Sequence, residues 1–276
     1  MPRLTLPNLS LHYLDTGAGT PILLIHGHPF DCTSWSPQLE SAVPGFRLIA
    51  PDLRNFGLTT SPTPPTLFAD YARDLISLAD ALALRRFVVL GLSMGGHVAL
   101  ELAALAPHRL LGLVLCGTYA QLDSPEKKAS RYTLADRLDR EGLAPYAAEV
   151  LPKMLCAQSL ANNPALAAPL LAMMERCPAA GASIALRLRA EHPDYVPVLD
   201  SLTVPTLILV GEHDTFTPVP DAQLMHAHAP KSTLVVLPGA GHLTNLEQPF
   251  AFNRSLLTFL ESLPTHAPCP TSSVIP

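Results

Sequence analysis

The chain has 276 residues, a length that allows one large α/β domain or two small ones. Its 48% hydrophobic and 15% charged content indicates a globular protein with a sizeable core rather than a disordered chain. A net charge of −5, without any run rich in Lys and Arg, argues against a nucleic-acid partner and against binding to an anionic membrane surface.

The cysteines and the apolar segments indicate the class of protein further. The five cysteines are scattered and none forms a C-x-x-C pair, so neither a disulfide framework nor a zinc module is predicted. No apolar run reaches the roughly 18 residues of a membrane span, and the first residues lack the apolar stretch of a signal peptide. We therefore expect a soluble cytoplasmic protein. The sequence leaves the oligomeric state open.

Strand-like and helix-like segments alternate along the chain. The predicted strands are Leu9–Leu14, Pro21–Ile25, Phe46–Ala50, Phe87–Leu90, Leu111–Cys116, Thr206–Val210 and Thr233–Leu237. The predicted helices are Leu67–Leu84, Met94–Leu105, Val219–Ala229 and Leu246–Leu263. This alternation predicts an α/β fold, in which helices cover both faces of a mostly parallel sheet.

One long stretch, residues 119–195, interrupts the alternation because it contains only helical segments broken by prolines. A single crossover needs far fewer residues. We therefore predict a helical cap at 119–195, inserted into an α/β core formed by 1–118 and 196–263, with ordinary crossover helices as the alternative. The tail 264–276 holds four prolines among small polar residues and is predicted to be disordered.

The most specific motif is Gly91-Leu92-Ser93-Met94-Gly95, which has the form G-x-S-x-G. It follows a predicted strand and opens a predicted helix. A sharp strand-to-helix turn of this kind exposes the serine hydroxyl, and glycines at both ends remove Cβ atoms that would clash in it. We therefore predict Ser93 as a nucleophile; a flexible Gly/Ser turn is the alternative.

A serine hydroxyl needs a base to become a good nucleophile. Among eleven histidines, His242 lies in a glycine-rich loop after the last predicted strand, where α/β sheets place catalytic groups. The acid that orients the base should lie between the serine and the histidine in chain order. Asp214 directly follows the strand Thr206–Val210 and is predicted to take this role. Glu212 is the alternative acid.

The loop after Pro21–Ile25 is predicted to complete the site. In hydrolases of this type it supplies one backbone N–H to the oxyanion, and the residue after the nucleophile supplies the other. The candidates are the amides of His28 and Met94. Phe30, in the same loop, is predicted to line an apolar substrate pocket together with side chains of the cap.

No metal or cofactor is predicted. His226 and His228 stand two apart on a predicted helix and so point to different faces, which argues against a shared metal ion. In the cap, we expect Arg187 and Arg189 to be solvated and the substrate to be neutral or singly anionic.

Five motifs occur in the order typical of the α/β-hydrolase superfamily: H-G-x-P at 26–29, D-x-R at 52–54, G-x-S-M-G-G at 91–96, G-x-x-D at 211–214 and G-x-G-H at 239–242. The chain resembles this superfamily from about Leu9 to Leu263, and in particular small carboxylesterases, 3-oxoadipate enol-lactonases and cofactor-free haloperoxidases (perhydrolases). The resemblance implies an eight-stranded, mostly parallel sheet flanked by helices, with a helical cap after the sixth strand. It also implies the same catalytic roles for Ser93, Asp214 and His242, and oxyanion amides at His28 and Met94.

Two departures from the family pattern stand out. Relatives usually carry glycine after D-x-R, whereas this chain has Asn55. Because Asn tolerates left-handed backbone geometry, we expect the turn to survive. The only tryptophan is Trp35, so the cap tryptophan that some enol-lactonases use is missing.

The expected function is hydrolysis of a small-molecule carboxylic ester or lactone through an acyl-serine, without a cofactor. A carbon–carbon bond hydrolase or perhydrolase with the same triad is one alternative. A non-catalytic small-molecule binding protein on this scaffold is the other.

Overall fold

The computed structural model describes residues 2–6, 8–41 and 43–264. Apart from Pro264, the tail predicted to be disordered lies outside these residues. No helix in the described ranges is both long enough and apolar enough to cross a lipid bilayer.

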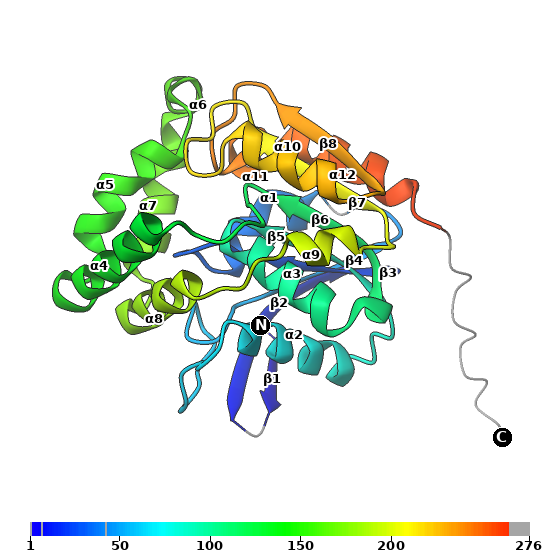
Figure 1. The fold of residues 1–276 in the computed structure, drawn as a ribbon, viewed down its shortest axis with the longest axis horizontal. Helices are drawn as coiled ribbons and strands as arrows, with labels where there is room; N and C mark the ends of the chain where they lie inside the picture. The colour runs from blue at the N-terminus through cyan, green and yellow to red at the C-terminus, as the bar shows by residue number, and fades with distance from the viewer. Residues whose placement is uncertain (1, 7, 42, 265–276) are drawn as a thin grey trace.

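Eight strands form one sheet in the order β1-β2-β4-β3-β5-β6-β7-β8 (Figure 1). They are β1 (Arg3–Leu6), β2 (Leu9–Gly17), β3 (Thr20–Ile25), β4 (Phe46–Pro51), β5 (Phe87–Leu92), β6 (Leu110–Cys116), β7 (Thr206–Gly211) and β8 (Ser232–Leu237). The pairs β1–β2 and β2–β4 are antiparallel, and all other neighbours are parallel. The predicted eight-stranded, mostly parallel sheet is therefore confirmed.

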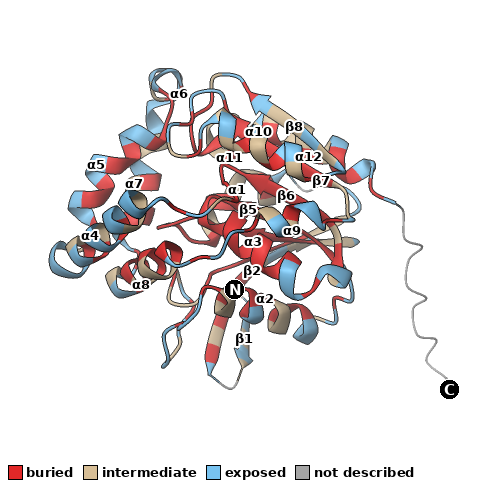
Figure 2. Ribbon diagram, in the orientation of Figure 1, coloured by how far each residue is buried: buried red, intermediate tan, exposed pale blue. Residues whose placement is uncertain are grey.

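The burial of each strand explains how visible it is in the sequence. Every residue of β5 and of β7 is buried, as expected for strands covered on both faces (Figure 2). By contrast, β1 lies at the sheet edge, and its residues are only exposed or half-buried. The residue pattern predicts the other seven strands but not β1, because its four residues, Arg-Leu-Thr-Leu, are too few to show a clear pattern.

Helices flank the sheet: α1 (Ser36–Glu40), α2 (Ala69–Ala81), α3 (Met94–Leu105), α9 (Val196–Asp200), α10 (Val219–His228), α11 (Thr244–Glu247) and α12 (Pro249–Glu261). The predicted single helix Leu246–Leu263 is in fact two helices. Gln248 separates them with a non-helical backbone (φ −129°, ψ 57°). The reason is that the ring of Pro249 disfavours helical geometry in the residue before it.

Between β6 and β7 the chain forms α4 (Pro125–Glu141), α5 (Ala144–Met154), α6 (Ala157–Asn162), α7 (Ala167–Glu175) and α8 (Ala179–Ala190). Figure 1 shows these helices gathered on one side of the molecule. Within the group, α4 packs along α8 and α5 packs against α7.

Candidate active site

Ser93 occupies a strained turn between β5 and α3, with φ 55° and ψ −114°. An L-residue adopts such a positive φ only when its surroundings enforce it. The two flanking glycines allow the turn to be this tight. A Cβ at Gly91 would lie 2.1 Å from the carbonyl oxygen of Gly95, and one at Gly95 would lie 2.2 Å from that of Ile25. The close approach of three backbone segments thus explains the G-x-S-x-G spacing.

His242 and Asp214 lie on the loops that follow β8 and β7, and Nδ1 of His242 is 2.8 Å from Oδ2 of Asp214. The carboxylate also accepts hydrogen bonds from the backbone N–H groups of Phe216 (2.8 Å) and Thr217 (3.0 Å) and from the Thr217 hydroxyl (2.7 Å). Burial would raise the pKa of Asp214, but His242 and the bonds from Thr217 hold it below its ordinary value. An ionised Asp214 keeps the proton of the imidazole on Nδ1 and leaves Nε2 to act as a base.

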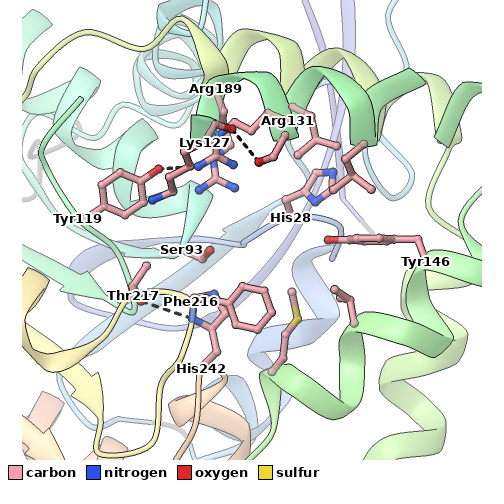
Figure 3. Close-up of a pocket in the computed structure, with 15 residues that line it drawn as sticks. His28, Ser93, Tyr119, Lys127, Arg131, Tyr146, Arg189, Phe216, Thr217 and His242 are labelled. Atoms are coloured by element: carbon pink, nitrogen blue, oxygen red, sulfur yellow. Dashed lines mark hydrogen bonds between the residues drawn. The ribbon is translucent and has the colours of Figure 1, made fainter. Parts of the chain in front are cut away.

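Ser93 and His242 line the same cavity, which has a volume of about 200 Å³ (Figure 3). Asp214 lies behind His242 and is 4% exposed. The structure therefore brings together all three residues that the sequence proposes as a triad. They come from loops after β5, β7 and β8, at the carboxyl ends of parallel strands, where α/β sheets place their ligands.

Two backbone N–H groups beside Ser93 have no partner among the described residues. Met94 is the first residue of α3, where an amide lacks an acceptor within the helix. His28 lines the cavity and lies in the loop after β3, the strand that pairs with β5. This loop passes so close to the turn that a Cβ at Gly27 would lie 3.2 Å from the Cβ of Ser93. Neither the His28 amide nor the Met94 amide donates a hydrogen bond within the described part of the chain.

Phe30, which the sequence predicts to line the substrate pocket, does not line the Ser93 cavity. Phe30 is 2% exposed, and it borders a second cavity of about 350 Å³, next to Asp31 and Cys32. Its backbone N–H bonds the carbonyl oxygen of Gly27 at 3.0 Å. This bond closes a turn between His28 and Phe30, so the two side chains border different cavities.

The expectation that Arg187 and Arg189 are both solvated is wrong for Arg189. Arg187 is partly exposed and pairs with Asp136 and Asp139 at 2.6 and 2.8 Å. Arg189 lines the Ser93 cavity and is 8% exposed. Two positions along a helix correspond to a rotation of about 200°, so one side chain faces solvent when the other faces inward.

Sequence reasoning missed most of the remaining cavity wall. Lys127 and Arg131 come from α4, Tyr146 from α5, and Phe216 from the loop after β7. No local motif marks these residues, because their position depends on how α4 and α5 pack over the sheet loops.

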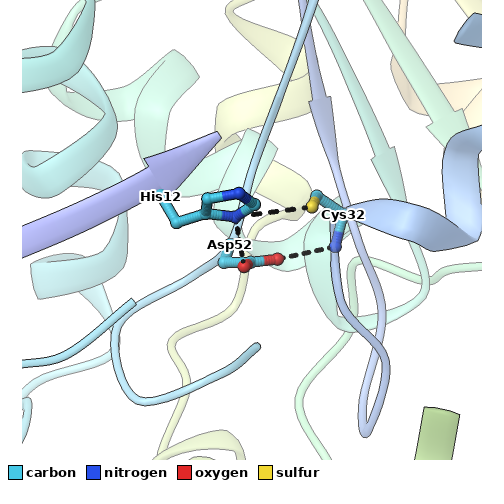
Figure 4. Close-up of side chains that lie close together, drawn as sticks. All are labelled: His12, Cys32 and Asp52. Carbon is cyan, nitrogen blue, oxygen red and sulfur yellow. Dashed lines mark hydrogen bonds and ion pairs between the residues drawn. The ribbon is translucent and has the colours of Figure 1, made fainter. Parts of the chain in front are cut away.

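A second cluster lies away from Ser93 and contains His12, Cys32 and Asp52 (Figure 4). In the described ranges it is the one group of His, Cys and acidic side chains close enough to share a metal ion. However, Asp52 accepts hydrogen bonds from the backbone N–H of Cys32 (2.7 Å), the backbone N–H of Leu58 (2.8 Å) and His12 Nδ1 (2.8 Å). Burial and the Asp52 charge raise the pKa of the Cys32 thiol, which disfavours the thiolate that a metal requires. We interpret the cluster as an anchor that joins two loops.

The turn after D-x-R is retained, although this chain has Asn55 where relatives usually have glycine. Asn55 has φ 63°, in the left-handed region. Its carbonyl oxygen lies so close to α8 that a Cβ at Gly181 would be 2.0 Å away from it. The D-x-R loop therefore directly supports the helix that carries Arg189.

Comparison with known proteins identifies the family of the chain. A family model described as "Alpha/beta hydrolase family" matches residues 22–255. The 3-oxoadipate enol-lactonase 2 of Acinetobacter baylyi is 27% identical over 92% of this chain and 94% of its own length.

Two solved structures are also similar. A thermophilic esterase from Thermogutta terrifontis, solved with malate bound, is 37% identical with a TM-score of 0.91, over 95% of this chain and 98% of the esterase. The enol-lactonase of Burkholderia xenovorans LB400 is 28% identical with a TM-score of 0.86, over 94% of this chain and 100% of the enol-lactonase. The chain belongs to the α/β-hydrolase family, because the family model spans most of its length and the eight strands form the expected sheet.

Proposed function

We propose that this α/β-hydrolase is a carboxylic ester hydrolase that cleaves a small-molecule ester or lactone through an acyl-serine intermediate. The observation that carries the proposal is the placement of Ser93 and His242 in one cavity, with Asp214 bonded to the histidine from behind. The esterase and the enol-lactonases among its relatives support the same reaction class.

The first half of the reaction forms the acyl-enzyme. Nε2 of His242 takes the hydroxyl proton as Oγ of Ser93 bonds to the carbonyl carbon. The carbonyl oxygen becomes an oxyanion, which accepts hydrogen bonds from the amides of His28 and Met94. Each donor of this type contributes about 3–4 kcal/mol to the transition state. When the carbon–oxygen bond to the leaving group breaks, His242 returns the proton to the leaving alkoxide.

The second half releases the acid. A water molecule loses a proton to His242 and attacks the acyl carbon; the bond to Ser93 Oγ then breaks and Oγ takes back the proton. Asp214 stabilises the imidazolium in both halves. Every proton moves between substrate, water and protein groups, so the mechanism requires no cofactor.

The helices α4–α8 act in this proposal as a cap at 119–195 on a core formed by 1–118 and 196–263. The core loops supply Ser93 and His242, whereas α4, α5 and α8 supply Arg131, Tyr146 and Arg189. Changes in the cap would therefore alter substrate choice more than the chemical step.

We also propose a cytoplasmic location. Its support is that the four cysteines in the described ranges are free and buried, a usage typical of reducing compartments.

The test is release of 4-nitrophenol from acetyl, butyryl and octanoyl esters by the unaltered chain and by Ser93→Ala. We expect the substitution to lower kcat by at least about 10⁴-fold, because the serine is the attacking group. Its circular dichroism spectrum should be unchanged. Retained turnover in Ser93→Ala would exclude Ser93 as the nucleophile.

A second set of substrates addresses the alternatives that share this triad. If the unaltered chain hydrolyses no ester or lactone but cleaves a diketone, it is a carbon–carbon bond hydrolase. Peracid formation from hydrogen peroxide and a carboxylic acid would instead identify a perhydrolase. Tight binding without turnover would support a binding protein.

A further inference from the structure

The cavity wall that faces Ser93 is cationic. It includes Lys127 and Arg131 from α4 and Arg189 from α8, and no Asp or Glu is among the described residues that line the cavity. In Figure 3 these three side chains lie on one side of Ser93, and His242 lies on the other. A substrate that reacts at Ser93 must therefore lie next to these cationic side chains.

The charge of Arg131 is already balanced by the protein. Its Nε contacts Oδ2 of Asp123 in a short ion pair, and one of its terminal nitrogens donates to the Tyr119 hydroxyl at 2.5 Å. Tyr119 in turn donates to Asp123 at 2.5 Å. Lys127 is also engaged, because its Nζ is 3.4 Å from Asp123 and 3.6 Å from the centre of the Tyr119 ring. One buried carboxylate, Asp123, thus interacts with both of the α4 cations that line the cavity.

Arg189 has no such partner. Its guanidinium makes no ion pair and donates no hydrogen bond within the described part of the chain, and its Nε is buried without a partner. Burial and the nearby Arg131 lower the pKa of Arg189 to about 10, so the side chain remains protonated at neutral pH. The residue is therefore a buried, unpaired cation at the edge of a cavity.

Such a cation is unfavourable for the folded protein, because burial removes the hydration of the charge and no partner replaces it. Asp123 attracts Arg189 from a distance, but this carboxylate is already paired with Arg131 and forms no ion pair with Arg189. The other charged residues of the cavity wall, Lys127 and Arg131, are also cations. Burial and Arg189 lower the pKa of His28 to about 3, so that His28 is neutral. An anion that enters the cavity would supply the missing partner. The planar guanidinium suits a carboxylate, which it can bind through two parallel hydrogen bonds.

We propose that Arg189 binds a carboxylate of the substrate, so that the preferred substrate is a small ester or lactone carrying one negative charge. The inference rests on the proposed function of Ser93 and adds the class of substrate. The cavity volume of about 200 Å³ is below the range of about 300–1,000 Å³ typical of drug-sized ligands. This size favours a short acid over a long acyl chain.

The test compares two esters of the same shape and different charge. One is the 4-nitrophenyl monoester of glutaric acid, and the other is 4-nitrophenyl 5-methylhexanoate, in which an isopropyl group replaces the carboxylate. The enzymes are the unaltered chain, Arg189→Met, Arg189→Lys and Arg187→Met. Arg187→Met is the matched control, because it removes a cation from the same helix outside the cavity.

We expect the unaltered chain to prefer the anionic ester. Arg189→Met should lower kcat/KM for that ester by about 10- to 100-fold, the loss expected for a charged hydrogen bond. It should lower kcat/KM for the neutral ester by a smaller factor, so that the preference for the anionic ester falls by about 10-fold or more. Arg189→Lys should recover part of the loss and Arg187→Met should cause none. Equal losses on both esters, or an equal effect of Arg187→Met, would overturn the proposal.

A binding measurement separates this inference from the proposed function. Monomethyl glutarate is titrated into Ser93→Ala and into Ser93→Ala combined with Arg189→Met, and the heat is measured. Binding that requires Arg189 supports the anion site even if no ester is hydrolysed. Turnover of neutral esters together with no binding of this anion overturns the inference and leaves the proposed function intact.

Thermal unfolding controls for misfolding. Because Arg189→Met removes an unpaired buried charge, its melting temperature should equal or exceed that of the unaltered chain. Monomethyl glutarate should raise the melting temperature of Ser93→Ala but not that of the double variant. If Arg189→Met fails to fold, Arg189→Gln takes its place in the same comparisons.

Discussion

The backbone N–H of His242 donates a hydrogen bond of 2.7 Å to the carbonyl oxygen of Met154, the last residue of α5. The backbone of Gly241, the residue before the histidine, also packs closely against Met154. A Cβ at this glycine would lie only 2.7 Å from the Met154 carbonyl oxygen. The loop that presents the proposed base is therefore built against the helical segment between β6 and β7. A change in the packing of α5 would displace His242 directly.

One carboxylate holds the two segments together. Oε1 of Glu247 accepts hydrogen bonds from the backbone N–H groups of Gly241 (3.0 Å) and Leu243 (3.1 Å). Its Oε2 accepts one from the N–H of Cys156 (2.7 Å). Glu247 thus bonds to the residues on both sides of His242 and to the chain just after α5, and it acts as a positioning residue.

Glu247→Gln should lower kcat by about 10-fold or more, because a small displacement of a catalytic group is costly. KM for the anionic ester should change little, since Arg189 is untouched. The matched control is Glu212→Gln: this side chain bonds the Gly239 N–H of the same loop at 3.0 Å but is 52% exposed. Steady-state kinetics of both variants checks the prediction, and equal kcat values for the two would contradict it.

The strained backbone at Ser93 predicts a difference between two inactive variants. Ser93→Ala keeps a Cβ at φ 55°, whereas Ser93→Gly relieves the strain. Both should lose ester turnover, and Ser93→Gly should have the higher free energy of unfolding by about 1 kcal/mol. Urea unfolding followed by circular dichroism measures this difference. A lower value for Ser93→Gly would show that the turn is not strained.

The buried ion pair of Asp123 with Arg131 predicts a dependence of stability on pH. Their side chains are 0% and 10% exposed. Burial alone would raise the pKa of Asp123, but His192, Arg131 and Tyr119 hold it below its ordinary value. Since the folded pKa is lower than the unfolded one, the contribution to stability is complete above about pH 4 and is lost as the pH falls through the folded value.

Asp123→Asn should therefore lower the free energy of unfolding at pH 7 by about 3–5 kcal/mol, because Arg131 stays buried without its carboxylate. Below about pH 4, the unaltered chain should lose stability more steeply than the variant. Urea titrations between pH 3 and 7 provide both numbers. Parallel pH curves for the two proteins would count against the ion pair.

The fold class and the candidate triad could be predicted from residue patterns, because the signals for both are local. The interior strands are buried on both faces and read as short apolar runs, of which β7 is an example. Ser93 and His242 stand in short motifs where glycines are required by close backbone contacts, such as that of Gly91 with Gly95. The spacing of these glycines therefore indicates the local backbone geometry directly.

The shape and the charge of the cavity could not be predicted from residue patterns, because both depend on how distant segments pack. Whether Arg189 faces solvent or Ser93 depends on the packing of α8 along α4, and that packing brings together residues about fifty positions apart in the sequence. Phe30 faces away from Ser93 because a hydrogen bond between backbone atoms closes a turn before it. The residue types of the loop give no sign of this bond. Long-range packing sets the direction of a side chain, and its residue type alone does not contain that information.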